Sequence, residues 1–364
     1  MVLPLIGRIY YVERKAMNIN CVDLFCGVGG LTYGVGKTGI NIVAGYDIDK
    51  ASRYPYERNN DAEFICKDVK EIISGEIKGL YPSDTDIRML MGCAPCQPFS
   101  TYNRLSRSAP SRVEKMDLLN YFGQQVRQVR PDIVSMENVP QLAKERVFRD
   151  FLTLLEEERY HVEWRVVYAP DYGVPQTRKR LLLLASRLGQ ISLIPPTHNT
   201  AHRTVRDAIG GLPRLEAGMV DDKDNLHRAR RLSNLNLKRI RASVPGGSWK
   251  DWPDELKLAA YKKDSGQTFG SVYGRLQWDQ PSSTITTQFI GYGSGRFGHP
   301  EQDRALSLRE GALLQTFPKS YYFVDPDVGA DYSSQQVALQ IGNAVPPRLG
   351  EIIGLSVLRH LQTV

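Results

Sequence analysis

Residues 23–34 read DLFCGVGGLTYG and complete a short apolar run that begins at residue 19. Glycines at positions 27, 29 and 30 allow a tight turn and let the backbone approach a ligand closely. The N–H groups at the start of the following helix would face that ligand. The spacing differs from the dinucleotide pattern G-x-G-x-x-G. The stretch therefore predicts a strand–turn–helix unit that binds a ligand, and the identity of the ligand does not follow from this stretch alone.

The first half of the chain alternates short apolar runs with longer amphipathic ones. This rhythm is typical of βαβ units and predicts an α/β fold with a Rossmann-like, doubly wound, mostly parallel sheet. In such a sheet the loops after the strands open on one edge, where ligands bind. We expect strands at residues 19–25, 41–46, 63–66, 86–91, 132–136, 161–168 and 179–185, and helices at 31–37, 50–60, 114–129 and 141–159.

The alternating rhythm ends after residue 184. Residues 193–199, LIPPTHN, are typical of a linker, and 200–290 are rich in Gly, Arg, Ser, Asn and Trp without a clear period. A helical pattern returns at Ser307, and a closing helix is expected at 351–361. The predicted organisation is an N-terminal appendage (1–18), a main domain (19–198 and 291–364) and a smaller, irregular or β-rich domain (199–290).

Composition limits the class of protein. The 364 residues are 41% apolar and 24% charged, as in ordinary soluble globular proteins. No apolar run approaches the roughly 20 residues that span a bilayer, so we expect no membrane contact. Five cysteines do not make a disulfide framework, which favours a cytoplasmic setting. The net charge is +7, and residues 203–241 carry ten basic against five acidic residues. This excess indicates either a polyanionic partner or a solvated basic face.

Two aspartates follow neighbouring strands of the predicted sheet. Asp47 ends the second strand, 20 residues after Gly27, where a carboxylate can accept from both hydroxyls of a ribose. Asp68 follows the third strand and could accept from an adenine amino group. Each aspartate alone would more often be a helix cap. Together with the glycine turn they indicate a cofactor that contains adenosine.

The remaining edges carry reactive groups. Residues 92–100, GCAPCQPFS, hold Cys93 and Cys96 as C-x-x-C, which fits a redox pair, half of a metal site, or a nucleophile whose neighbour only packs behind the strand end. Glu137 ends an apolar strand, where it could be a helix cap or an acid that lies beside the cysteines. Arg178 and Arg180 alternate onto one side of the last strand, as surface residues or as ligands of a phosphate or base oxygen.

Together these residues resemble the DNA (cytosine-5) methyltransferases over nearly the whole chain after Asn18. The similar stretches, in the family's order, are DLFCGVGG, APCQPFS, MENV, QTRKR, RLQWDQPSSTIT (275–286), HPEQDRALSLREGALLQTFP (299–318) and QIGNAVPP (340–347). One stretch departs from the family: TYNRLSRSAPSRVEKMDLL (101–119) is basic and poor in Gly, where the family often has a Gly-containing loop and an Asp-x-Arg element. Contacts of this loop are not predicted.

The resemblance implies a mechanism. Cys96 would add to C6 of cytosine, because C5 is too weak a nucleophile to attack a methyl donor directly. Glu137 would bind N3 and the exocyclic amine, Arg180 the base carbonyl, and Arg178 would support the loop. The target atom is inaccessible inside a duplex, so the base must be flipped.

The resemblance also implies the ligands. Residues 19–198 and 291–364 would bind S-adenosylmethionine, leaving S-adenosylhomocysteine as product, and 199–290 would recognise the target in double-stranded DNA. The cofactor-binding residues implied are Phe25, Gly27, Val28, Gly30, Asp47, Ile48, Asp68, Val69, Gly92, Pro95, Leu118, Asn343 and Val345. The DNA-binding residues implied are Gln97, Ser100, Arg228, Arg230, Arg231 and Arg239. We expect a monomer in the cytoplasm, associated with the nucleoid through DNA, with a restriction or defence protein as a cognate partner.

Other functions explain fewer of these features. A thiol–disulfide oxidoreductase leaves the glycine turn and Asp47 unexplained. A structural zinc site needs a second ligand pair, which Cys21, Cys26 and Cys66 do not supply by spacing, so no metal is expected. An exocyclic-amine methyltransferase normally shows an Asp/Asn-Pro-Pro-aromatic loop in place of Pro-Cys-Gln. An RNA cytosine-5 methyltransferase on the same fold remains an alternative, although the insert at 199–275 favours duplex DNA.

Overall fold

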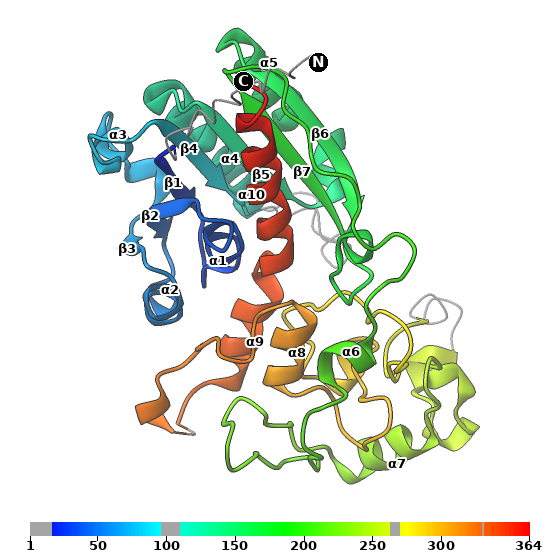
Figure 1. Cartoon of the computed structure of the whole chain (residues 1–364). Helices are drawn as coiled ribbons and strands as arrows, with labels where there is room; N and C mark the ends of the chain where they lie inside the picture. The colour runs from blue at the N-terminus through cyan, green and yellow to red at the C-terminus, as the bar shows by residue number, and fades with distance from the viewer. Residues whose placement is uncertain (1–16, 96–109, 263–269, 330) are drawn as a thin grey trace, which may run out of the picture.

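The computed structural model describes residues 17–95, 110–262, 270–329 and 331–364, and it contains one seven-stranded sheet (Figure 1). The strand order is β3-β2-β1-β4-β5-β7-β6, and β7 runs antiparallel to the other six strands. The mostly parallel α/β fold is therefore confirmed, and each expected strand lies within two residues of its predicted bounds. The strands are β1 Ile19–Leu24, β2 Asn41–Asp47, β3 Glu63–Cys66, β4 Ile87–Gly92, β5 Ile133–Asn138, β6 His161–Tyr168 and β7 Lys179–Ser186.

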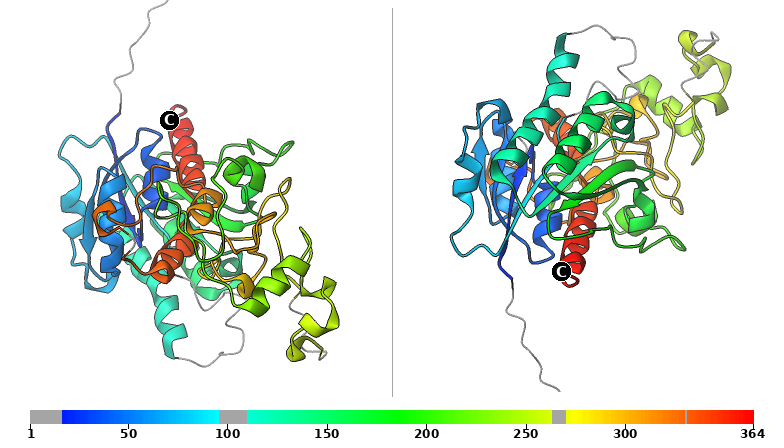
Figure 2. Two further views of the ribbon diagram at one scale, coloured as in Figure 1. Left: turned by 90° about the horizontal axis from the view of Figure 1, so that it is seen from below. Right: turned by 90° about the horizontal axis from the view of Figure 1, so that it is seen from above.

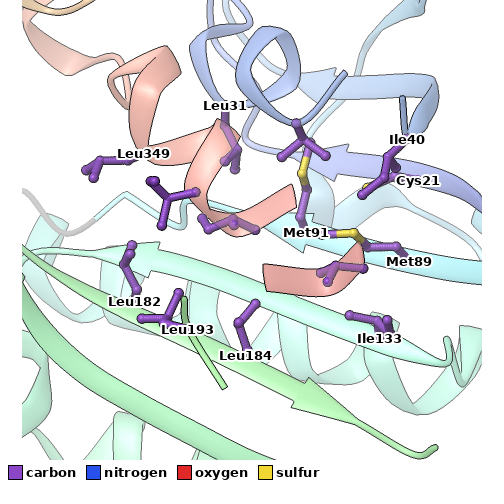
Figure 3. Close-up of a cluster of buried hydrophobic side chains, with 14 of the residues drawn as sticks. Cys21, Leu31, Ile40, Met89, Met91, Ile133, Leu182, Leu184, Leu193 and Leu349 are labelled. Carbon is purple, nitrogen blue, oxygen red and sulfur yellow. The ribbon is translucent and has the colours of Figure 1, made fainter. Parts of the chain in front are cut away.

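Helices cover both faces of the sheet (Figure 2). On one face, α1 (Gly30–Gly36) and α10 (Pro347–Leu361) pack on alternate residues of the strands, several of which Figure 3 labels. On the other face, α4 (Pro110–Val129) and α5 (Arg146–Glu157) cover the residues in between. α1 and α10 can approach closely because Gly34 has no side chain. A Cβ there would lie 2.0 Å from the carbonyl oxygen of Pro347. Burial on both faces explains the apolar character of the strands.

Some helices differ from the sequence prediction. The helix expected at 50–60 is a 3₁₀ turn, Lys50–Ser52, followed by α2, Arg53–Asn59. The helix expected at 141–159 is divided in the same way, because Glu145 is extended between the turn Pro140–Lys144 and α5. A short helix, α3 (Glu76–Leu80), was not predicted, since only one of its residues is buried. α10 begins four residues earlier than expected, with a proline in its first turn.

The chain between the sheet and α10 is irregular. It contains the short helices α6 (Val205–Ile209), α7 (Asn234–Ala242), α8 (Leu308–Leu314) and α9 (Ser334–Asn343), several 3₁₀ turns and isolated β-bridges. Within 199–262 and 270–290 no residue belongs to a named strand, so of the two alternatives offered by the sequence this part is irregular rather than β-rich.

The core does not divide at residue 290, where the sequence placed a domain boundary. One hydrophobic cluster joins residues before that point, such as Phe289, to residues after it, such as Leu308. A second cluster joins Trp249 and Trp252 to Tyr292. Side chains on the two sides of 290 thus bury one another, and we call the whole segment 199–345 the irregular region. In Figure 1 it lies together below the sheet (green to orange) before α10 returns.

At the other end of the chain, residues 1–16 of the predicted appendage lie outside the described residues. Asn18, its last member, donates its backbone N–H to Asp86 and so belongs to the start of the sheet. Of the helices that the structure describes, none is long and apolar enough to cross a membrane.

Candidate active site

A cavity of about 360 Å³ lies at the carboxyl ends of β1, β2, β4 and β5, between the sheet and α9. Segments far apart in the chain contribute to it: the glycine turn, the residues after β4 and β5, the start of β7, and the end of α9. The predicted residues that line it are Phe25, Gly27, Val28, Asp47, Pro95, Glu137, Arg178, Arg180, Asn343 and Val345. The structure therefore brings the predicted cofactor turn and the predicted base-binding residues into one cavity.

The glycine turn is held by contacts on two sides. Phe25, Gly27 and Gly29 have left-handed backbone conformations, which glycine adopts easily and phenylalanine rarely does. A Cβ at Gly30 would lie 2.3 Å from the carbonyl oxygen of Val345, so only glycine fits there. On the other side, the hydroxyl of Tyr321 donates to the carbonyl of Val28 at 2.5 Å. The irregular region thus fixes the shape of the turn.

The two aspartates of the predicted cofactor site have different surroundings. Asp47 lines the cavity and accepts from the backbone N–H groups of Gly27 and Asp49, both at 2.9 Å. Burial raises its pKa, and these hydrogen bonds oppose the shift. Asp68 caps the 3₁₀ turn Val69–Glu71 by accepting from the N–H of Lys70 at 3.0 Å. For Asp68 the structure shows the capping role that the sequence had left open.

The other predicted cofactor residues do not line the cavity, and their role stays a prediction. Ile48 follows Asp47 and is 68% exposed. At the end of β4, a Cβ on Gly92 would lie 2.8 Å from the carbonyl oxygen of Leu24. The members of this group are Gly30, Ile48, Asp68, Val69, Gly92 and Leu118.

Glu137 is almost completely buried at the end of β5 and has a partner at each oxygen. Its Oε2 accepts from the thiol of Cys93, with Sγ at 2.9 Å. Its Oε1 lies 2.8 Å from Nε of Arg180. That N–H is not directed at the oxygen, so the contact is an ion pair and Oε1 has no aligned hydrogen-bond donor. Oε1 is therefore available to a ligand in the cavity, as an acceptor or, when it carries a proton, as a donor.

Arg178 and Arg180 both reach the cavity, but only Arg178 is fully buried. It donates to the carbonyls of Ile285 (3.3 Å) and Ala344 (3.5 Å), and so joins β7 to the irregular region. Burial, with a smaller effect of the Arg180 charge, lowers the pKa of Arg178 to about 9. Arg180 is the arginine that lies beside Glu137. A supporting role for the first arginine and a ligand-binding role for the second fit this geometry.

Sequence reasoning missed Asp23, the last residue but one of β1. Its Oδ2 accepts from the hydroxyl of Thr32 at 2.7 Å, while Oδ1 is buried beside the cavity without a hydrogen-bond partner. Burial raises the pKa of Asp23 to about 8. The sequence did contain the signal, because a carboxylate near the end of an apolar strand is costly to bury.

The predicted nucleophile loop lies outside the described residues, so the positions of Cys96, Gln97 and Ser100 are not described. The chain leads toward them along the cavity wall, which Cys93, Ala94 and Pro95 line.

The predicted DNA-binding arginines separate into two kinds. Arg230 and Arg231 are exposed and line, with the half-buried Arg228, a second hollow of about 340 Å³ near the start of α9. Arg239 is only 9% exposed, donates to the carbonyl of Leu256 and lies over two aromatic rings. This burial does not fit a phosphate contact, and we withdraw Arg239 from the DNA-binding set.

Comparison with known proteins identifies the class of enzyme to which the chain belongs. The profile of the C-5 cytosine-specific DNA methylases matches residues 19–359, and the chain belongs to this family of DNA cytosine-5 methyltransferases.

Individual relatives span nearly the same length. The chain is 50% identical over 345 residues to the Type II methylase M.HgiDII of Herpetosiphon aurantiacus, covering 94% of this chain and 95% of that protein. It is 29% identical to the Type II methyltransferase M1.HphI of Haemophilus parahaemolyticus, covering 94% and 87%.

Solved structures show the shared fold. A protein described as a DNA modification methyltransferase encoded within a prophage (E. coli) superposes with a TM-score of 0.73 at 22% identity, covering 94% of this chain and 99% of the other. The Dnmt2 methyltransferase of S. pombe gives 0.63 at 14% identity, covering 95% and 100%.

Proposed function

We propose that the protein transfers a methyl group to C5 of a flipped cytosine in a specific duplex DNA sequence, through a covalent bond between Cys96 and C6. The observation that carries this proposal is the shared cavity, in which Glu137 and Arg180 lie within reach of the same space as the glycine turn and Asp47. A redox or zinc function for Cys93 and Cys96 would leave this arrangement without a purpose.

The residues of the cavity suit cytosine. Oε1 of Glu137 has no aligned donor in the protein, and when protonated it would donate to N3, while Arg180 would turn from Glu137 to the base carbonyl. Both contacts draw electron density from the ring as the Cys96 thiolate adds to C6, and C5 becomes nucleophilic. After methyl transfer to C5, a base removes the C5 proton, the bond from sulfur to C6 breaks, and the thiolate is released.

The other part of the cavity fits S-adenosylmethionine, which supplies the methyl group when bound. Asp47 would accept from the ribose hydroxyls, and Phe25 would lie against the adenine. Burial disfavours the ionised form of Asp23, and a cationic partner at the unpaired Oδ1 would stabilise that form. The ammonium group of the methionine part would be such a partner.

Duplex DNA is the proposed substrate and the irregular region the proposed recognition surface. Arg230 and Arg231 are exposed there and free to approach phosphates, which position a protein without specifying sequence. Likeness to a Type II methylase supports a role in modification beside a cognate restriction or defence protein. RNA cytosine, the alternative substrate, is less well supported because the matching family is one of DNA methylases.

Methyl transfer from a labelled cofactor to duplex DNA, with an RNA of the same sequence as comparison, tests the proposal. We expect the full chain to modify DNA, and bisulfite sequencing of DNA from a host that expresses it to reveal one methylated sequence. Duplex DNA with 5-fluorocytosine at that position should form an adduct that survives denaturing electrophoresis, because fluorine blocks the proton removal that releases the enzyme. Cys96→Ala should form none. Methylated RNA with unmodified DNA, or an adduct that survives this substitution, would contradict the proposal.

A further inference from the structure

The thiol of Cys93 contacts the active site, although the sequence had suggested that it only packs behind β4. Cys93 follows β4 directly, is half-buried, and lines the cavity while also packing against the hydrophobic cluster under the sheet. Its Sγ lies 2.9 Å from Oε2 of Glu137 and donates to it. Because carboxylate oxygens are strong acceptors, this contact restrains the rotation of the carboxyl group.

The two oxygens of Glu137 therefore differ. Oε2 accepts from the thiol, while Oε1 has an ionic neighbour in Arg180 but no aligned donor. In the ionised carboxylate a half-turn would only exchange two equivalent oxygens. Once Glu137 carries a proton the oxygens differ, and the thiol, as a donor, favours the orientation in which Oε2 is unprotonated and Oε1 carries the proton toward the cavity.

A second contact between the same two strand ends supports this reading. The side chain of Asn138, which follows Glu137, donates to the carbonyl of Ala94, which follows Cys93, at 3.0 Å. In the thiol contact the donor follows β4 and the acceptor lies in β5, and in the amide contact the donor lies in β5 and the acceptor follows β4. Together they fix the relative position of the acid and of the chain that leads to residue 96.

We infer that Cys93 is a positioning residue, whose thiol donates to the unprotonated Oε2 of Glu137 so that the proton on Oε1 is presented to N3 of the flipped base. This inference rests on the proposed role of Glu137. It also answers the question of the C-x-x-C pair, because each cysteine then has its own task and no bond between them is required.

Three substitutions separate hydrogen bonding from packing. Cys93→Ala removes the donor and some volume, Cys93→Val removes the donor and fills the volume, and Cys93→Ser keeps a donor. We expect Ala and Val to lower the single-turnover rate of methyl transfer by about tenfold, the effect of losing one hydrogen bond to a charged group. Cofactor affinity and KM for DNA should stay unchanged, and Ser should restore most of the rate.

Cys21→Ala is the matched control, because Cys21 is a buried cysteine of the same cluster that does not line the cavity (Figure 3). It should lower stability slightly and leave the rate unchanged. The S–H stretching band of Cys93, isolated by subtracting the infrared spectrum of Cys93→Ala, should shift in Glu137→Ala, which a packing role would not produce.

The outcomes distinguish this inference from the proposed function. Folded Ala and Val variants with the wild-type rate would overturn the role of Cys93, as would a Ser variant as slow as Val. A wild-type protein that methylates no cytosine in DNA would refute the proposed function itself.

Discussion

In the seven-stranded sheet, backbone polar groups pair in the strand ladders, and most buried side chains are apolar. In the irregular region few strand ladders exist, and arginine side chains pair with many of the buried backbone carbonyls instead. Arg275 donates to the carbonyls of Ile240, His299 and Gln302, and Arg304 to those of Leu215 and Ala305. Each guanidinium offers five donors, so one side chain can satisfy several carbonyls.

A buried charge consequently has a different meaning in the two regions. Among the described strand residues, the buried charged side chains are Asp23 and Glu137, and both line the cavity. In the irregular region the buried arginines, Arg239, Arg275, Arg304 and Arg309, bind backbone carbonyls or acidic partners. A buried charged residue in the sheet therefore indicates the candidate active site, whereas a buried arginine in the irregular region more often stabilises the backbone around it.

The largest expected effect is the loss of Arg304, a completely buried side chain that binds Glu310 through two hydrogen bonds of 2.7 Å. Arg304→Met leaves a buried carboxylate without its partner, and we expect a loss of about 3–5 kcal/mol in urea unfolding. The double variant with Glu310→Gln should lose less. An exposed arginine such as Arg206, changed in the same way, should have little effect, and equal losses at both sites would contradict the contrast.

The same pair predicts a pH dependence of stability. Burial raises the pKa of Glu310, but hydrogen bonds and the charge of Arg304 outweigh it and lower the pKa from 4.5 to about 2. The contribution of a group with a depressed pKa is present above its unfolded value and is lost as the pH falls toward the folded value. Urea unfolding should show wild-type stability falling from pH 4.5 toward 2 more steeply than in the double variant.

In the sheet, the matching change is apolar. Leu184 lies in β7, fully buried in the cluster shown in Figure 3. Leu184→Ala removes apolar contacts and leaves a cavity, and we expect a loss of about 2–5 kcal/mol in urea unfolding. Methyl transfer well below the unfolding temperature should remain, because Leu184 does not line the candidate active-site cavity. If Leu184→Ala had wild-type stability, the surrounding side chains would have to move in and fill the cavity, and the prediction would be wrong.

A charge at the sheet edge should affect binding more than stability. Asp47→Ala removes the predicted acceptor for the ribose, and losing a hydrogen bond to a charged group costs about 1.5–3 kcal/mol, or roughly ten- to a hundredfold in affinity. Calorimetry should detect weaker binding of S-adenosylmethionine while DNA affinity is kept. Unchanged cofactor affinity in a folded variant would remove Asp47 from the site.

The smallest effects should separate the two kinds of arginine. Changing both Arg230 and Arg231 to Ala should reduce the slope of log affinity for DNA against log salt by about one unit per lost phosphate contact, without loss of stability. Arg239→Gln should leave the slope unchanged and lower stability by about 1–3 kcal/mol, because Arg239 supports the backbone at Leu256. A reversed pattern would restore Arg239 to the DNA-binding set.

The sequence located the strands and most of the cavity because both depend on local patterns. Alternating apolar runs define the strands, and the residue after each strand end falls on one edge of the sheet. That rule placed Asp47 and Glu137 together, whereas Arg180 lies at the start of β7 and reaches the same edge because β7 is antiparallel to β5. The rule could not supply the contact between Cys93 and Glu137, because whether two edge side chains touch depends on the register of β4 against β5.

For this protein, the sequence alone determined the α/β class, the strand positions, the glycine turn and the family resemblance that the comparisons confirm. Each of these features depends on a short stretch of sequence, whose periodicity and order can be recognised without knowing the contacts between distant segments. Only the tertiary structure decided which charges are buried, that residues on both sides of 290 share one core, and that Tyr321 fixes the turn through Val28. The physical reason is that burial and hydrogen-bond partners depend on how separate segments pack against one another, for example Val28 and Tyr321, and no local pattern records them.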